Sequence, residues 1–289
     1  MSITPRGGAS SAVGLLHDFS LEITGKDAGA LRSAGAAIPA GTRVHVTYLA
    51  QEDLSLRLAA ARTVREVGLV AVPHVSARRL RSRAEVDEFV GALRADGNAE
   101  HLFLVAGDPR TPEGPYADTL AVIESGVLED NDVRQVGVTG YPEGHPYIPD
   151  DVLWRSLEQK MSALAERAIG ASVTTQFGFD ADQVLSWVEK VRQRGVTVPV
   201  GVGVPGPAGA RRLLAYAARC GVGTSASIAK KYGLSLSNLM GSAGPDRFLD
   251  ALAARYDERR HGDLRLHFYT FGGVDATAAW TRRFANSAP

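Results

Sequence analysis

The sequence predicts a single-domain α/β fold, a (β/α)8 TIM barrel, and three of its features lead to this prediction. Short apolar runs rich in β-branched residues recur along the chain, and segments with helical apolar spacing follow them. The chain has 289 residues, which suits one large domain with a buried core. No internal repeat or Pro/Gly-rich linker divides it. Alternation alone also suits an open doubly wound sheet, but about eight strand–helix units in this length favour the barrel.

The predicted strands are apolar on both faces, which is typical of parallel strands that are buried on both sides. In chain order they are expected at residues 19–23, 44–48, 69–74, 102–106, 133–139, 172–177, 198–202 and 264–269. Parallel neighbours cannot be joined by tight hairpins, so each pair needs a crossover connection.

Helical spacing between the strands predicts these crossovers. The helices are expected at residues 54–67, 84–94, 151–168, 182–194, 208–219 and 246–259, and residues 224–244 add helical material before the last strand. Asp180 stands at one helix start, and Gly68 and Gly195 follow two helix ends. The N-terminal residues are polar and Gly/Ser-rich, so we expect a flexible tail over residues 1–15 and one barrel domain over residues 16–289.

The composition narrows the classes of protein to which the chain can belong. With 45% hydrophobic and 22% charged residues it is too apolar to stay disordered. Basic and acidic residues number 32 each, so neither nucleic acid nor an anionic membrane is an expected partner. Cys220 is the only cysteine, which fits a reducing compartment, and no apolar run approaches the roughly 20 residues that span a bilayer. We therefore expect a soluble, cytoplasmic protein.

Motifs of several enzyme classes are absent from the sequence. There is no P-loop, H-E-x-x-H, G-x-S-x-G or Cys/His metal spacing. Nucleotide hydrolase, zinc hydrolase and esterase functions therefore have no motif support, and no metal site is expected.

Polar side chains gather at the predicted C-terminal ends of the strands, where barrels carry their reactive groups. They supply carboxyl, hydroxyl, amide, phenol and imidazole groups, from Glu22, Thr47, Tyr48, His74, Asp108, Tyr141, His145, Gln176 and Tyr269. These groups are expected to converge on one rim.

Glu22 is the first candidate for acid–base chemistry. Strand alternation points it away from Leu21 and Ile23 and toward the barrel mouth. A carboxyl in an apolar mouth keeps its proton more readily and can act as a general acid. A rim carboxylate paired with Lys26 or an arginine is an equally weighted alternative. A lone strand-end histidine such as His74 is more often structural than catalytic.

Other strand-end motifs carry less information. Asp108, in Gly107-Asp108-Pro109, can accept a pair of N–H groups, although such a tripeptide is more often a plain turn. Gln176 can bind the edge of a heterocycle or bond within the core. The Gly-rich run 201–207 lacks the full dinucleotide spacing and is interpreted as a barrel turn. The hydroxyl-rich run 224–227 is interpreted as a helix cap. Three basic pairs are interpreted as solvated surface, although one of them could bind a pyrophosphate or a polyglutamate group: Arg78-Arg79, Arg211-Arg212 and Lys230-Lys231.

Several of these segments together resemble the methylenetetrahydrofolate reductase family. The most specific are residues 141–146 (Tyr-Pro-Glu-Gly-His-Pro) and 174–180 (Thr-Thr-Gln-Phe-Gly-Phe-Asp), and their order along the chain matches the family. Shorter matches are Val46-Thr47-Tyr48, Pro73-His74, Gly107-Asp108, Tyr116-Ala117-Asp118 and the stretch 267–270. The resemblance implies a catalytic TIM barrel that reduces 5,10-methylenetetrahydrofolate to 5-methyltetrahydrofolate.

The resemblance also implies roles for individual residues. Glu22 matches the general acid that protonates a folate nitrogen. Asp108 and Gln176 match residues that hold the pterin, and Tyr269, which matches a position beside the flavin, is assigned with them to the folate substrate. The remaining matches surround the family's flavin and are assigned to the cofactor: Thr47, His74, Tyr116, Tyr141 and His145.

The chain departs from the family where the flavin diphosphate would bind. It has Ala106 in place of an arginine before Gly107-Asp108 and residues 165–171 in place of a lysine-containing helix end. In place of a Gly-rich turn it has residues 49–53, which end in the acidic pair Glu52-Asp53. No aromatic residue stands in 205–210, where the family has one. Each lost charge-assisted bond costs about 1.5–3 kcal/mol. We therefore expect NADH or NADPH to pass its hydride directly to the folate iminium, with FAD retention doubtful.

Three rival interpretations remain at this stage. One is an ordinary FAD-dependent member of the family, and another is a folate-binding or regulatory barrel without catalysis. The third, a barrel lyase or aldolase, would need a strand-end lysine, and no predicted strand ends in one. The sequence leaves open the choice between NADH and NADPH and the oligomeric state.

Overall fold

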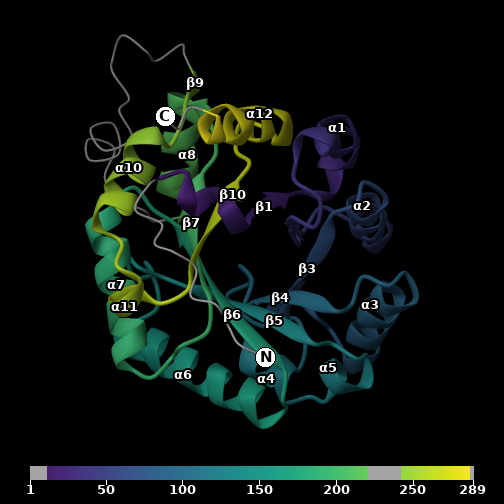
Figure 1. Cartoon of the computed structure of the whole chain (residues 1–289). Helices are drawn as coiled ribbons and strands as arrows, with labels where there is room; N and C mark the ends of the chain where they lie inside the picture. The colour runs from purple at the N-terminus through teal and green to yellow at the C-terminus, as the bar shows by residue number, and fades with distance from the viewer. Residues whose placement is uncertain (1–11, 221–241, 287–289) are drawn as a thin grey trace, which may run out of the picture.

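The computed structural model describes residues 12–220 and 242–286. Within these ranges, parallel strands close into a barrel in the order β1-β10-β7-β6-β5-β4-β3-β2 (Figure 1). The barrel strands are β1 (Phe19–Ile23), β2 (Arg43–Val46), β3 (Val70–Ser76), β4 (His101–Val105), β5 (Gln135–Gly140), β6 (Gly170–Phe177), β7 (Val200–Pro205) and β10 (Leu264–Tyr269). The predicted (β/α)8 barrel is confirmed.

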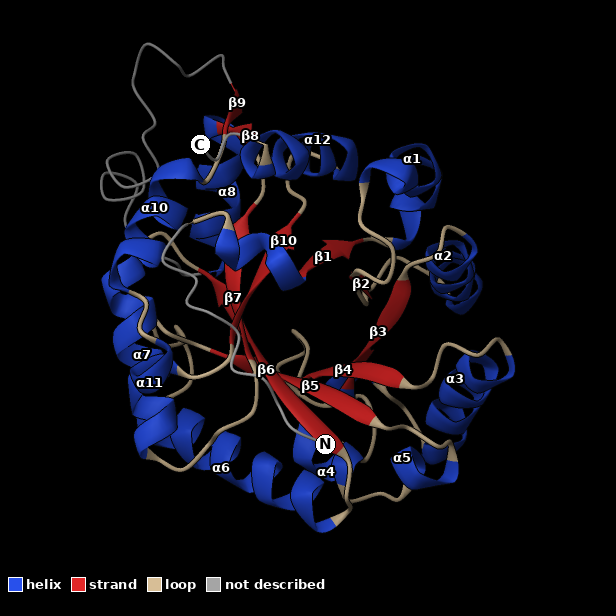
Figure 2. Cartoon of the chain, in the orientation of Figure 1, coloured by secondary structure: helices blue, strands red, loops and turns tan. Residues whose placement is uncertain are grey.

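Helices form an outer ring around the strands, as Figure 2 shows. The longer ones are α2 (Leu54–Glu66), α3 (Arg83–Ala95), α6 (Asp150–Glu166), α7 (Ala181–Gln193), α8 (Ala210–Cys220), α10 (Asp246–Arg255) and α12 (Val274–Ala285). The shorter ones are α1 (Ala28–Ala34), α4 (Thr119–Ile123), α5 (Val127–Asp130) and α11 (Glu258–His261). Asp180 caps α7, because its side chain accepts from the N–H groups of Asp182 and Gln183. Gly68 and Gly195 follow helix ends with φ of +79° and +81°, as their type predicts.

Two predicted helices differ from the structure. The helix expected from residue 208 begins at Ala210, because Ala208–Gly209 forms a short strand, β8, that pairs with β9 (Ser242–Ala243). The helix expected at 246–259 is interrupted, since Tyr256 is extended with ψ of 130° and Asp257 caps a separate helix, α11.

Some sequence expectations fall partly or wholly outside the described ranges. Residues 1–11 of the predicted tail lie there, whereas Leu15 and its neighbour Leu16 are buried in a 3-10 helix, η1 (Gly14–Asp18). The hydroxyl-rich run 224–227, Lys230-Lys231 and most of the expected helical material at 224–244 also lie outside the described residues.

The two faces of the barrel strands differ in character. Apolar side chains such as Leu21, Val44 and Leu266 are fully buried in the core cluster that joins strands and helices. The alternate positions carry polar groups: His45 on β2 lies 4.5 Å, centroid to centroid, from His267 on β10, although β1 separates these two strands. A contact that skips a strand passes through the barrel interior, so the interior is polar where the sequence predicted apolar faces on both sides.

The barrel closes between its first and last strands. Glu22 on β1 is in register with Tyr269 on β10. The Thr270 hydroxyl, just after β10, donates to the Glu22 carbonyl oxygen at 2.6 Å. The C-terminal end of β1 is therefore held by residues from the far end of the chain.

Candidate functional site

Glu22 lies at the C-terminal end of β1, and its carboxyl contacts two buried histidines. Oε2 is 3.5 Å from Nε2 of His267 and 3.8 Å from Nε2 of His74. The carboxyl side chain is 18% exposed, so one side faces the mouth while the other faces the rings. In the described part of the chain, these histidines take the place that Lys26 or an arginine was expected to occupy in the alternative interpretation.

A third histidine, His45, completes this cluster beneath Glu22. Its Nδ1 is 3.3 Å from Nε2 of His74, and both rings pack against Phe103 with centroid distances of 5.0 and 4.7 Å. On the other side, the Ser20 hydroxyl is 2.8 Å from Nδ1 of His267. We call Ser20, His45, His74 and His267 the histidine cluster.

Burial keeps two of these rings neutral. Removal from water lowers the pKa of His74 to about 4, even though the Glu22 charge acts in the opposite direction. Removal from water also places the pKa of His45 well below its ordinary value, and the neighbouring His267 and His74 lower it further. At neutral pH each of these two rings therefore carries one N–H and one lone pair.

Tyr269 connects the Glu22 side of the mouth to β6. Its hydroxyl donates to the carbonyl oxygen of Thr175 at 3.1 Å. Burial, and then the charge of Glu22, raise the pKa of Tyr269 well above its ordinary value, so the phenol stays protonated. Its ring packs against Phe177 and Phe271, with centroids 5.4 and 5.6 Å away.

Gln176 follows Thr175 at an irregular point of β6. The register of β6 against β7 shifts between Thr174 and Phe177, and Gln176 Oε1 accepts from the Phe177 N–H at 3.1 Å. This shift re-aims the side chain at the end of the strand. Gln176 is thus joined to Glu22 through Thr175 and Tyr269.

Asp108 lies on the rim after β4, and an arginine holds it. Its carboxylate accepts from Nη2 and Nε of Arg79 at 2.6 and 3.0 Å, while 73% of its side chain stays exposed. Gly107 turns the chain with φ of +90°, and a Cβ there would clash with the Ser76 hydroxyl. Arg79 was predicted to lie on a solvated face, but it is only 17% exposed and holds the carboxylate of Asp108, the residue predicted to bind the pterin.

Tyr141 and His145 stand on the loop after β5. Their rings meet edge to face at 5.3 Å, and His145 Nδ1 accepts from the Tyr147 N–H at 3.2 Å. Burial raises the pKa of Tyr141 and lowers that of His145. Tyr141 is close enough to Tyr269 for its charge to affect the pKa of that phenol.

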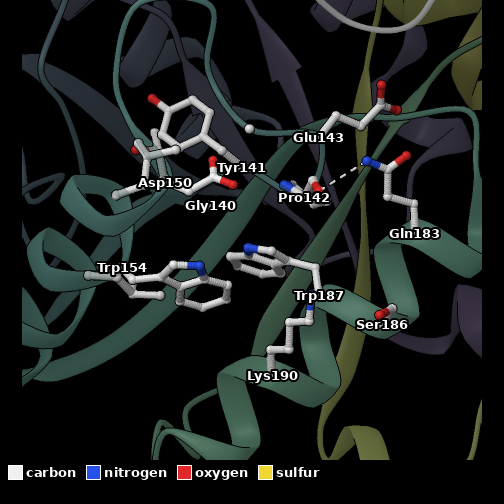
Figure 3. A pocket seen from close by; sticks show the side chains of 14 residues that line it. Gly140, Tyr141, Pro142, Glu143, Asp150, Trp154, Gln183, Ser186, Trp187 and Lys190 are labelled. Carbon is white, nitrogen blue, oxygen red and sulfur yellow. Dashed lines mark hydrogen bonds between the residues drawn. The ribbon is translucent and has the colours of Figure 1, made fainter.

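The same loop borders a cavity of about 300 Å³ between α6 and α7. Figure 3 shows Trp154 and Trp187 side by side at this cavity, and their rings stack at 5.6 Å. Gln183 closes one side by donating to the Pro142 carbonyl oxygen at 3.4 Å. The cavity lies among outer helices, whereas Glu22 lies on the barrel axis side of the strands.

The structure therefore brings some predicted site residues together and separates others. One connected group contains Glu22, His74, Tyr269 and Gln176. Thr47 lies beside it, because its N–H donates to the carbonyl oxygen of Ile23 at 2.9 Å. The Thr47 hydroxyl is buried and has no hydrogen-bond partner among the described residues. Three others stand apart: Asp108 on the rim, His145 on the loop after β5, and Tyr116 buried in the core at 5% exposure. Tyr141 is on the same loop as His145, but it comes near Tyr269.

Three members of the histidine cluster are absent from the predicted site residues. Ser20, His45 and His267 each precede a predicted site residue by two positions, at Glu22, Thr47 and Tyr269. Side chains two apart on a strand share a face. This spacing is the signal that could have identified them.

The start of α2, beside β2, is where a dinucleotide phosphate could bind to helix N–H groups. Asp53 caps this helix by accepting from the Leu56 N–H at 2.8 Å. Glu52 is buried, and its Oε2 accepts from the Gly25 N–H at 3.2 Å. Two carboxylates thus already bond N–H groups at this helix start, and their negative charge would repel a phosphate. The residues present therefore do not fit a flavin diphosphate here.

Metal and membrane features are absent from the described ranges. No group of histidine, cysteine, aspartate and glutamate side chains in residues 12–220 and 242–286 has the arrangement of a metal site. None of the helices in those ranges is both long enough and apolar enough to cross a bilayer.

Comparisons with known proteins give the family of this chain. Methylenetetrahydrofolate reductase 1 of Schizosaccharomyces pombe is 38% identical over 74 residues, which are 26% of this chain and 12% of that protein. Methylenetetrahydrofolate reductase (NADH) 1 of Zea mays is 28% identical over 134 residues, 42% of this chain and 22% of that protein. The matched segments thus span less than a quarter of these relatives.

A solved structure shares the barrel. It is a Clostridium thermocellum protein that binds two copies of 5-methyl-5,6,7,8-tetrahydrofolic acid, with a TM-score of 0.61 and 9% identity, covering 94% of this chain and 96% of that one. At this identity the likeness concerns the fold alone. The model of the methylenetetrahydrofolate reductase family matches residues 32–281, beginning after β1. Because that match covers most of the sequence, the chain belongs to the methylenetetrahydrofolate reductase family.

Proposed function

We propose that this protein reduces 5,10-methylenetetrahydrofolate to 5-methyltetrahydrofolate with a hydride taken directly from NADH or NADPH, and that Glu22 is the general acid. Membership of the family and the names of its relatives support the substrate and the reaction. The observation that carries the acid assignment is the position of Glu22, which is partly exposed to the mouth and lies 3.8 Å from Nε2 of the buried, neutral His74.

The chemistry needs one proton and one hydride. Glu22 donates its proton to a folate nitrogen, which opens the methylene bridge to an electrophilic iminium. Reduced nicotinamide supplies the hydride that adds to the iminium carbon. Glu22 ends the turnover as a carboxylate, and the protein's main remaining task is to align the two substrates and exclude water.

We assign the folate to the Glu22 side of the mouth. Gln176 and Asp108 offer an amide and a carboxylate for the pterin edge, and Tyr269 with Phe177 and Phe271 offers aromatic surface. Phe271 follows β10, so it can supply the aromatic contact that residues 205–210 lack. The Clostridium thermocellum protein with the same fold binds a folate, which supports a folate as the class of ligand.

We assign the nicotinamide dinucleotide to Thr47, which follows β2, and to Tyr141 and His145 on the loop after β5. The partnerless Thr47 hydroxyl is a candidate donor to this ligand. His74 and Tyr116 would act from behind this surface, because both are buried. Carboxylates at the start of α2 argue against FAD, and the name of the maize relative supports NADH.

Anaerobic oxidation of NADH by purified, flavin-free protein with methylenetetrahydrofolate tests the proposal. We expect 5-methyltetrahydrofolate without added flavin, and a loss of turnover of at least about 100-fold in Glu22→Gln with folate still bound. Glu124→Gln, which changes an exposed carboxylate just after α4, is the matched control and should keep full activity. Product that forms only after FAD is added would identify a flavoenzyme, and folate binding without any turnover would identify a binding protein.

A further inference from the structure

The loops that follow β4 and β5, at the C-terminal end of the barrel, meet at Arg110 and Tyr147. The guanidinium carbon of Arg110 lies 5.9 Å from the centroid of the Tyr147 ring. Tyr147 is 81% exposed, more than any other large apolar or aromatic side chain in the described part of the chain. Most of this ring is therefore open to a ligand, and it stands two residues from His145, which we assign to the nicotinamide dinucleotide.

The backbone of the loop after β5 holds Tyr147 in place. The Tyr147 N–H donates to Nδ1 of His145 at 3.2 Å, and the Ile148 N–H donates to the His145 carbonyl oxygen at 3.4 Å. His145 and Ile148 also pair as an isolated antiparallel bridge. The Tyr147 ring meets the His145 ring with 6.0 Å between their centroids. The exposed ring therefore has a defined position on the loop.

A series of side chains leads from Tyr147 back to the barrel mouth. The His145 ring lies 5.3 Å from the Tyr141 ring. Tyr141 in turn comes near Tyr269, at the C-terminal end of β10. The order from the mouth outward is therefore Tyr269, Tyr141, His145, Tyr147 and Arg110. A dinucleotide whose nicotinamide binds beside Tyr141 and His145 can extend its other half toward Tyr147 and Arg110.

Arg110 carries a positive charge that no carboxylate neutralises within the described residues. On the same loop, the carboxylates of Asp108 and Glu113 are both held by Arg79, whose Nη atoms lie 2.6 and 3.4 Å from them. No ion pair or hydrogen bond joins the Arg110 guanidinium to any residue in 12–220 and 242–286. A guanidinium presents a planar fork of N–H groups that matches two phosphate oxygens. Arg110 therefore has the charge and the geometry to bind a phosphate.

We propose that Arg110 binds the pyrophosphate of the nicotinamide dinucleotide and that Tyr147 stacks on its adenine ring. The inference rests on the proposed function, because it extends the dinucleotide site that we assign to Thr47, Tyr141 and His145. A pyrophosphate is negatively charged and the acidic start of α2 repels it, so it needs a cation elsewhere. An exposed tyrosine ring accepts a nucleobase through its π face. Arg110 and Tyr147 together thus supply what the adenosine diphosphate half requires.

Contacts with this half act on binding and not on the hydride step. They are made equally before and during the transfer, because the reacting carbon belongs to the nicotinamide. Binding of this kind lowers KM and leaves kcat unchanged. Arg110 and Tyr147 are therefore binding residues, and a hydride donor without the adenosine diphosphate half cannot use them. Reduced nicotinamide riboside is such a donor.

Arg110→Met and Tyr147→Leu remove the charge and the ring from exposed positions, so the melting temperature should stay unchanged. In each variant we expect KM for NADH to rise at least about fivefold, with kcat at saturating NADH unchanged. The value of kcat/KM for reduced nicotinamide riboside should equal that of the wild type. Calorimetric titration with ADP gives a readout that needs no turnover, and the affinity for ADP should fall by a similar factor. Tyr147→Phe, which keeps the ring, should behave as the wild type.

Arg259→Met is the matched control, because it removes an exposed arginine from α11, which precedes β10 and so lies at the other end of the barrel. Its KM for NADH and its affinity for ADP should equal the wild-type values. Unchanged KM and unchanged ADP affinity in Arg110→Met and Tyr147→Leu would overturn the inference and leave the proposed function standing. An equal loss with NADH and with reduced nicotinamide riboside, or an equal effect of Arg259→Met, would also overturn it. The proposed function fails in a different way, if the wild type gives no 5-methyltetrahydrofolate from either donor without flavin, and the inference then falls with it.

Discussion

The buried state of His74 makes the stability of the protein depend on pH in a defined direction. Its pKa is about 4 in the folded protein, against 6.5 for an ordinary histidine. The unfolded chain therefore binds the proton more readily, and the free energy of unfolding falls as the pH drops below about 6.5, until the folded ring also titrates near pH 4. At about 1.36 kcal/mol for each pH unit, the gap corresponds to roughly 3 kcal/mol.

His74→Gln removes this titration and keeps a neutral polar side chain. Urea unfolding between pH 7 and pH 4 should therefore show that the free energy of unfolding falls further for the wild type than for the variant. The difference between the two losses should approach roughly 3 kcal/mol at pH 4. Comparing the two proteins cancels the carboxylates that titrate in the same range. His17→Gln, on the exposed surface of η1, should follow the wild-type curve. Parallel curves for wild type and His74→Gln would refute the reasoning.

Two further substitutions near the site, and one control in α1, can be compared by urea unfolding. Gly107→Ala should lower the free energy of unfolding by about 2–4 kcal/mol, because it places a Cβ at positive φ and against the Ser76 hydroxyl. Gly29→Ala in α1, where a Cβ meets nothing, should instead leave it unchanged or raise it by about 0.5–1 kcal/mol, and equal effects at the two glycines would contradict the structure. Tyr269→Phe, which removes the bond to the Thr175 carbonyl oxygen, should cost about 1 kcal/mol, and no change would mean that this bond does not hold β10 to β6.

The sequence predicted elements well where local pattern decides them. The bounds of β1 and β10 agree with the prediction at both ends, because an alternating run and its flanking residues mark them. The start of α8 was predicted two residues early, since the strand that displaces it depends on pairing with Ser242–Ala243, far along the chain. Periodicity within one segment cannot report such a partner.

The site was predictable in part for the same reason. Glu22 and Tyr269 could be placed at strand ends from their own segments, and the structure puts them in register. The contact of His45 with His267 crosses the barrel between strands that are not neighbours, so it appears only once the order of strands is known. The Arg79–Asp108 pair likewise joins the segment after β3 to the segment after β4, and neither segment's sequence indicates that the other is its partner.

The closure between β1 and β10 sets the order in which the protein can mature. The Thr270 hydroxyl and the Glu22 carbonyl oxygen that it bonds are 248 residues apart, so their contact has to wait for nearly the whole polypeptide. Contacts between such distant segments form late, because the chain must first lose the entropy of a very long loop. A nascent chain on the ribosome is therefore expected to build most of its helices before the C-terminal end of β1 and Glu22 reach their final position.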